Sequence, residues 1–329
     1  MVCFSQSNPP EHMIKVLSNF ARCLKELRHA FAQLCRSELP GICAANNYAV
    51  DLLRGLREQF LRLPLSKVGW AAIAVGGLGR GDMSFLSNLD LLFLYNRRLP
   101  EDVKQAIREL TCSLSEAGFD ARYVTASLSS VGDSIRTNFS FLTTYLETQF
   151  IGGDQAFYQR WQSTFMQSFG VKRRRRFLKD LIAHRQIRLQ HYGDSSCLLE
   201  PNLKESAGGL RDLHVIRWAA RIFFNDPAFE TGVKNDVLTG EEQCWLEKAH
   251  DFLWRVRLQL HQLADARHDK LLFNKQERIA ELLGFSDSAE ALAVESFMRL
   301  YYRHTARVRR TTEFFLERLQ DKQIKGTES

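Results

Sequence analysis

The chain has 329 residues, 45% of them hydrophobic, and its 45 lysines and arginines exceed its 38 aspartates and glutamates, which gives a net charge of +7. This length predicts two domains with apolar cores, and the composition excludes general disorder. No stretch approaches the roughly 18 to 20 apolar residues of a membrane span, and residues 1–11 lack the pattern of a signal peptide, so we expect a cytoplasmic protein without membrane partners.

Apolar periodicity predicts an α-helical N-terminal part. Apolar residues recur every three or four positions between Val16 and Leu34, the spacing of an amphipathic helix. The pair Pro40-Gly41 interrupts this pattern, and a second helix of the same period ends before Pro64.

The pattern then changes to that of a small mixed α/β domain. Short apolar runs at 71–75 and 89–95 are bounded by turn residues and predict buried strands. A helical pattern fills the stretch from 100 to 118, and 120–125 predicts a third strand. From about residue 130 to the end, we expect almost only helix.

The charge excess is concentrated in one place within this helical part. Residues 172–188 hold eight basic side chains and one acid, Asp180, and taking these away leaves 37 residues of each sign. The stretch is either the solvated start of a helix or a contact for a nucleotide or an acidic protein. Nucleic-acid binding is disfavoured, because Phe177 is the only aromatic residue inside the stretch.

A glycine pair between the first two strands carries the clearest chemical signal. Gly76 and Gly77 end the first apolar run, and glycine lets backbone N–H groups approach phosphates closely. Positions 88 and 90 share one face of the second strand, where two carboxylates could hold Mg²⁺. Arg80 either contacts a phosphate or braces the turn. This arrangement is typical of phosphoryl or nucleotidyl transfer.

The layout resembles the DNA polymerase β superfamily of nucleotidyltransferases. More narrowly, residues 76–82 read GGLGRGD and 87–92 read SNLDLL, which are similar to the GGYGRGE and SDIDLL motifs of bacterial PII uridylyltransferases. A second block has LEPNLKE at 199–205 and GGLRDLH at 208–214, similar to that family's EPNIKE and GGLRD motifs. A third block follows from 252 onward.

The resemblance implies an α+β fold, with a small mixed-sheet nucleotidyltransferase core of the polymerase β type. Its implied divisions are an N-terminal helical segment (1–66), the nucleotidyltransferase-like domain (67–135), a helical domain (136–320) and a polar tail (321–329). The family transfers UMP from UTP to a tyrosine of PII, a small signalling protein of nitrogen regulation, so PII is the implied acceptor.

The resemblance also implies site residues. The implied catalytic and metal-binding residues are Asp90 and Asn88, and the implied nucleotide-binding residues are Gly76, Gly77, Arg80, Ser87, Lys204 and Arg211. Lys204 and Arg211 either reach the nucleotide or only fasten the helical domain to the catalytic domain, through Asp212 and Glu200.

One position departs from the family pattern. Asn88 stands where the family has aspartate, and its neutral amide gives a divalent cation less counter-charge than a carboxylate would. Asp120, at the edge of the third strand, is the remaining candidate for a further carboxylate. The Mg²⁺ site is therefore expected to be weak or lost. Two interpretations stay open: a transferase that uses UTP or another NTP with a compromised metal site, and a non-catalytic nucleotide-binding homologue with a regulatory or scaffolding role.

Overall fold

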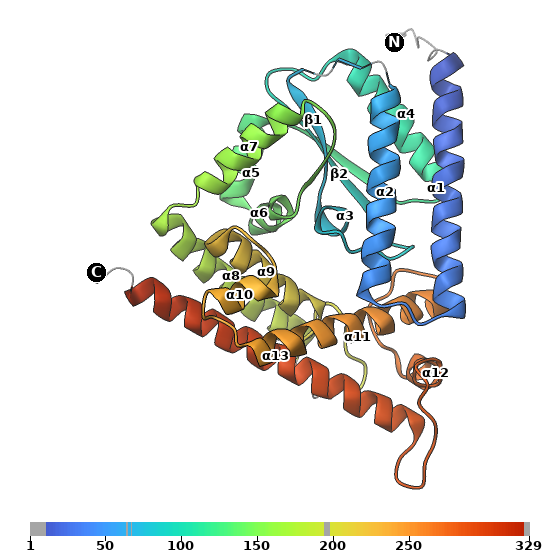
Figure 1. Cartoon of the computed structure of the whole chain (residues 1–329), viewed down its shortest axis with the longest axis vertical. Coiled ribbons are helices and arrows are strands. Elements are labelled where there is room, and N and C mark those ends of the chain that lie inside the picture. The colour runs from blue at the N-terminus through green and yellow to red at the C-terminus, as the bar shows by residue number, and fades with distance from the viewer. Residues whose placement is uncertain (1–10, 64, 67, 194–197, 326–329) are drawn as a thin grey trace. The chain divides into compact units, whose positions relative to one another are not determined.

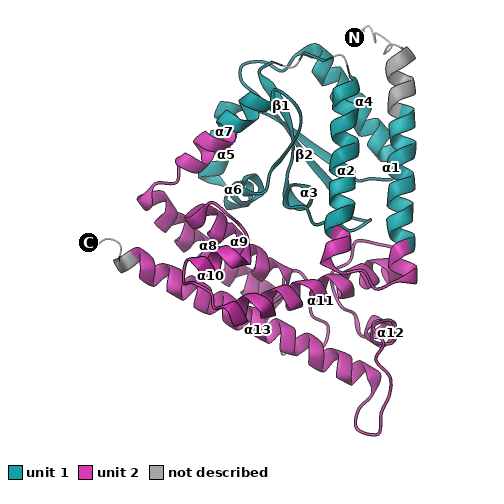
Figure 2. Ribbon diagram, in the orientation of Figure 1, with its two compact units in different colours: residues 1–33, 46–161 teal, residues 34–45, 162–329 magenta. Residues whose placement is uncertain are grey.

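The computed structural model describes residues 11–63, 65–66, 68–193 and 198–325, and the chain divides into two compact units (Figures 1 and 2). Unit 1 comprises residues 1–33 and 46–161, and unit 2 comprises 34–45 and 162–329. The fold is mixed α+β, as the sequence predicts. No helix within the described ranges is long and apolar enough to cross a membrane.

Unit 1 is built on a four-stranded sheet in the order β3-β2-β1-β4. Its strands are β1 (Trp70–Ala74), β2 (Leu89–Tyr95), β3 (Ala121–Ser127) and β4 (Gln149–Gly153). Strand β2 runs parallel to β3, whereas β1 is antiparallel to both β2 and β4. The three predicted strands are confirmed. The prediction of almost only helix beyond residue 130 missed β4, because two apolar residues followed by Gly152-Gly153 give no strand signal.

Helices surround this sheet within unit 1. The helices up to the end of β4 and just beyond it are α1 (Glu11–Ser37), α2 (Ile42–Arg62), α3 (Gly76–Arg80), α4 (Glu101–Glu116), α5 (Leu128–Thr137), α6 (Phe139–Leu146) and α7 (Gln155–Gln167). Phe60 of α2 packs against Trp70 and Phe93, with ring centroids 6.1 and 6.2 Å away. Phe93 and Asp90 are three residues apart on β2, so α2 covers the face opposite to Asp90.

The regular elements of unit 2, in the part that the structure describes, are helices, and one isolated β-bridge joins Asn202 to Lys270. Its helices are α8 (Val171–Tyr192), α9 (Leu210–Phe224), α10 (Phe229–Lys234), α11 (Gly240–Ala264), α12 (Phe273–Leu282) and α13 (Ala293–Lys325). Leu253 and Trp254 of α11, with Phe297 and Tyr301 of α13, are at most 1% exposed and form its core. Helix α13 continues to Lys325, past the start of the polar tail expected from 321, and residues 326–329 lie outside the described residues.

Candidate nucleotide site and motif clusters

The two glycines of the first motif begin a short helix, α3, instead of the open turn that the sequence suggests. Gly76 has a φ of +60°, a backbone conformation that favours glycine, and a Cβ there would lie 3.2 Å from Asp90 Oδ2. The Val75 N–H donates to the Asp90 carbonyl at 3.0 Å. The fold therefore brings Gly76 and Asp90 together, as the motif predicts.

Helix α3 is fastened by its arginine. Arg80 Nε donates to both carboxylate oxygens of Asp82 at 2.8 Å, and Nη1 donates to Glu147 Oε2 at 2.5 Å. Burial alone would lower the pKa of the Arg80 guanidinium, but the two carboxylates outweigh burial and raise this pKa. Of the two predicted roles of Arg80, this geometry supports bracing.

Two residues that sequence reasoning missed complete the support of α3. Glu147 and Gln149 lie just before and within β4, and Gln149 Nε2 donates to the Gly79 carbonyl at 3.2 Å. A Cβ on Gly79 would lie 2.0 Å from the Glu147 carbonyl oxygen, so this glycine is required by close backbone packing. These partners are nearly 70 residues distant along the chain, and no local pattern marks them.

The second motif places its polar residues at the entry to β2. Asn88 directly precedes the strand, and it is half-buried, as are Ser87 and Asp90. Ser87 Oγ accepts a hydrogen bond from the Ser84 N–H at 2.9 Å and so closes the turn before the strand.

The neighbouring strand contributes a basic residue next to Asp90. In the parallel register of β2 and β3, Asp90 pairs with Arg122, and paired positions project from the same face. Asp120, the candidate for a further carboxylate, is exposed and forms an ion pair with Arg122 at 3.0 Å. The position beside Asp90 thus carries a cation where a metal site needs an anion.

These residues fit a divalent cation poorly. Asp90 is the one carboxylate of the NLD motif, Asn88 is neutral, and Arg122 would repel the ion. Among residues 11–63, 65–66, 68–193 and 198–325, no group of three histidine, cysteine, aspartate or glutamate side chains is placed to hold a metal.

The predicted residues of the second block lie in unit 2. Arg211 donates to Glu205 at 2.9 and 3.3 Å, and Lys204 Nζ is 3.8 Å from the same carboxylate. Asp212 and Glu200, the two carboxylates through which Lys204 and Arg211 are expected to fasten the helical domain, pair with other residues in the structure. Asp212 pairs with Arg185 and Arg188, and Glu200 pairs with Lys270 and accepts from the Phe273 N–H.

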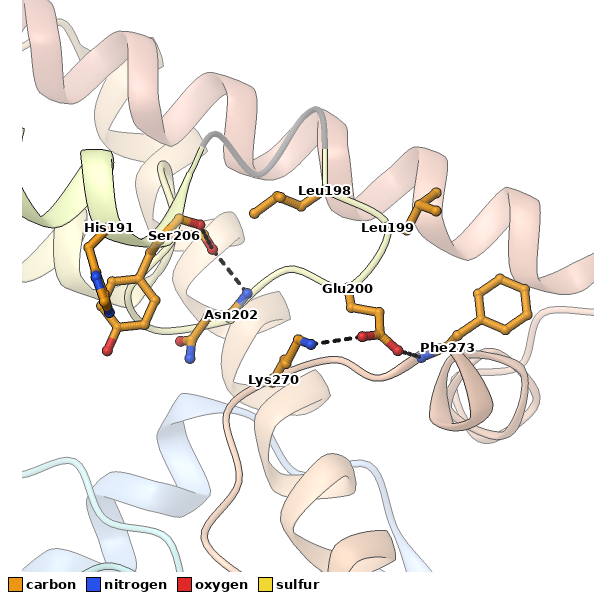
Figure 3. Close-up of a pocket in the computed structure, with 9 residues that line it drawn as sticks. His191, Leu198, Leu199, Glu200, Asn202, Ser206, Lys270 and Phe273 are labelled. Carbon is orange, nitrogen blue, oxygen red and sulfur yellow. Dashed lines mark hydrogen bonds and ion pairs between the residues drawn. The ribbon is translucent and has the colours of Figure 1, made fainter.

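The same block forms the wall of a pocket of about 560 Å³ within unit 2 (Figure 3). The pocket is lined by His191, Tyr192, Leu198, Leu199, Glu200, Asn202, Ser206, Lys270 and Phe273. Figure 3 shows the Glu200 carboxylate between the Lys270 ammonium and the Phe273 N–H, at 2.8 and 3.0 Å. None of the eight predicted site residues lines this pocket.

Comparisons with known proteins agree with the motifs. The GlnD PII-uridylyltransferase family model matches residues 176–316, which lie in unit 2. A bifunctional uridylyltransferase/uridylyl-removing enzyme of Nitrosococcus oceani is 31% identical over 252 residues, which are 77% of this chain and 28% of that enzyme. Enzymes of the same name from Rhodospirillum rubrum (34% identity, 76% of this chain, 27% of the enzyme) and Azotobacter vinelandii (32%, 82% and 30%) are also similar.

The similar segment makes up most of this chain but less than a third of the length of each of these three enzymes. The motifs of the second and third blocks fall inside the family match, and those of the first block lie before it. The chain therefore carries, at residues 176–316, a segment that matches the GlnD PII-uridylyltransferase family model.

Proposed function

We propose that this chain is a nucleotide-binding regulatory homologue of the PII uridylyltransferases that does not transfer UMP efficiently. The observation that carries the proposal is the surrounding of Asp90, with neutral Asn88 two residues before it and Arg122 beside it on β3. Family members are named for uridylyl transfer, so UTP is the nucleotide we expect to bind.

The chemistry of phosphate explains why loss of a metal need not mean loss of binding. A triphosphate needs positive charge around it, and in nucleotidyl transfer divalent cations supply that charge. The guanidinium of Arg122 is permanently charged and presents several N–H donors, so it can pair with phosphate oxygens directly. Gly76 and Gly77 begin α3 beside Asp90, and we assign them, with Ser87, to the nucleotide.

A second candidate function is slow UMP transfer to a protein hydroxyl, with PII as the acceptor. The retained contact of Gly76 with Asp90 favours it. In that reaction the hydroxyl oxygen forms a bond to the α-phosphorus of UTP, the bond to the bridging oxygen of pyrophosphate breaks, and the hydroxyl proton is released. The residues present give no adequate ligand set for the Mg²⁺ that such a reaction uses.

Intact-mass spectrometry separates the two functions. The full chain would be incubated with a PII protein, each NTP in turn, and Mg²⁺ or Mn²⁺, and the masses of both proteins measured over time. We expect no nucleotide adduct on PII, while UTP still protects the chain against thermal unfolding. A UMP adduct that disappears in the Asp90→Ala variant would contradict the regulatory proposal and establish the transferase.

A further inference from the structure

A cluster of five charged side chains forms where the second and third motif blocks meet inside unit 2. Its members are Lys204, Glu205, Arg211, Arg257 and Asp269. The backbone joins the blocks, because the Leu203 N–H donates to the Asp269 carbonyl at 2.8 Å and the Leu271 N–H donates to the Pro201 carbonyl at 2.9 Å. Motifs that lie some 50 residues apart in the sequence thus build one local structure.

The two carboxylates of this cluster are already engaged. Asp269 Oδ1 accepts from Arg257 Nε at 2.8 Å and lies 3.1 Å from His261 Nε2. Glu205 accepts from Arg211 through both of its oxygens. Lys204 Nζ is 3.8 Å from Glu205 Oε1, which is too long for a hydrogen bond. Three cations therefore share two anions.

The neighbouring titratable groups do not cancel this excess. His261 is fully buried, and burial lowers its pKa against the opposing effect of Asp269, which favours the neutral imidazole near pH 7. Arg188 donates to the Glu205 carbonyl, but its charge is paired with Asp212. The cluster keeps one surplus positive charge.

The surplus charge falls on Lys204. Partial burial, followed by the nearby charges of Arg211 and Arg257, lowers the pKa of the Lys204 amine to about 8. The side chains of Lys204 and Arg211 are 32% and 27% exposed, so both reach solvent, while that of Arg257 is only 9% exposed. An anion arriving from solvent would meet Lys204 and Arg211 and offset the surplus charge.

We propose that Lys204 and Arg211 bind the phosphate group of a small phosphorylated ligand at the surface of unit 2. The planar guanidinium of Arg211 and the compact ammonium of Lys204 are both common phosphate partners. Arg257 adds positive potential from beneath, and its own hydrogen bonds stay with Asp269. This site lies within unit 2 and does not depend on nucleotide binding by Arg122 in unit 1.

Calorimetry on the full chain tests the proposal with three probes: inorganic phosphate, pyrophosphate and UMP. We expect Lys204→Gln to weaken binding about tenfold, the effect of losing one charge-assisted hydrogen bond. Lys234→Gln is the matched control, because it removes a lysine charge in unit 2 at an exposed ion pair with Glu230, and it should leave binding unchanged. If Lys204→Gln weakens the binding of UMP alone, the natural ligand is a nucleotide. If Lys204→Gln weakens the binding of all three probes, the site recognises the phosphate group itself. Equal affinity in the wild type and Lys204→Gln, or binding of none of the probes, would overturn the proposal.

The pH dependence gives an independent readout. Inorganic phosphate is mainly the dianion above about pH 8, so between pH 8 and 9.5 the change in phosphate binding reports on the protein. In the wild type, affinity should fall several-fold across this window as the Lys204 amine loses its proton. In Lys204→Gln the affinity should be flat, and a fall of the same size in this variant would contradict the role of Lys204. The Arg122→Ala variant should still bind phosphate at Lys204 and Arg211. This variant therefore separates a failure of the present proposal from a failure of the proposed nucleotide site in unit 1.

Discussion

At the scale of single residues, Asp90 determines what the first motif can do. It lies against Gly76, follows Asn88 and shares its register position with Arg122. A cation at this edge would meet the carboxylate of Asp90, the amide of Asn88 and the guanidinium of Arg122, with which the Asp120 carboxylate is paired. This is a poor set of ligands for Mg²⁺. A phosphate at this edge would compete with Asp120 for the guanidinium of Arg122.

Restoring the family's carboxylate should restore metal affinity. We expect Asn88→Asp to tighten Mn²⁺ binding about tenfold, because a second carboxylate then faces the same spot as Asp90. Electron paramagnetic resonance of free Mn²⁺ would measure this. Asn96→Asp adds the same charge at an exposed position after β2 and should change nothing. Unchanged Mn²⁺ affinity in Asn88→Asp would mean that residues 88 and 90 do not form the metal position of this fold.

Gly76 should tolerate no side chain. Its positive φ and the 3.2 Å approach of a Cβ to Asp90 Oδ2 predict that Gly76→Ala lowers the free energy of unfolding by about 1 to 3 kcal/mol. Gly132→Ala is the control, because nothing lies within 4 Å of a Cβ at this position in α5, and it should raise stability by about 0.5 to 1 kcal/mol. Urea unfolding measures both, and a neutral Gly76→Ala would contradict the tight contact.

At the scale of elements, a buried ion cluster joins α8 to α9. Asp212 is fully buried and accepts from Arg185 Nε and Nη2 at 3.0 and 2.9 Å, from Arg188, and from the Gly208 N–H. Burial would raise the pKa of this carboxyl, but the two arginines outweigh burial and lower the pKa. Removing this carboxylate would take from Arg188 its ion-pair partner and leave Arg185 with Glu313 at 3.6 Å.

Asp212→Asn should therefore cost about 3 to 5 kcal/mol of unfolding free energy at pH 7, as measured by urea unfolding. Because the folded pKa of Asp212 is depressed, its contribution is present above the unfolded value of about 3.9 and is lost as the pH falls through the folded value. The difference between the wild type and the variant should shrink in acid. Asp180→Asn breaks only an exposed pair with Arg176 and should change stability by less than about 0.5 kcal/mol. An equal effect of the two substitutions would contradict this role of Asp212.

The elements also show where sequence reasoning succeeds and where it stops. Strands β1 to β3 and the helices beside them follow local apolar patterns, so they could be predicted. Strand β4 has Gly152 and Gly153 in its last positions, and its identity depends on pairing with β1. The partners of Arg80, Lys204 and Arg211 are set by packing between distant segments, which a single sequence does not reveal.

At the scale of the whole molecule, the structure shows that part of the net charge of +7 is paired inside unit 2. The sequence places the surplus in residues 172–188, but Arg185 and Arg188 lie inside unit 2 and pair with Asp212. Arg173 stacks on Phe169, and Arg175 donates to the Gln323 carbonyl. The exposed positive charge of this stretch is therefore concentrated near the start of α8, and the arginines near its end serve to hold unit 2 together.

The regulatory account of the whole chain depends on nucleotide binding that needs no metal. Calorimetric titration of the full chain with UTP, once with EDTA and once with Mg²⁺, tests it most directly. We predict affinities within a few-fold of each other, and a loss of at least about tenfold in both conditions for Arg122→Ala. Binding that occurs only with Mg²⁺, or that survives Arg122→Ala unchanged, would contradict the account.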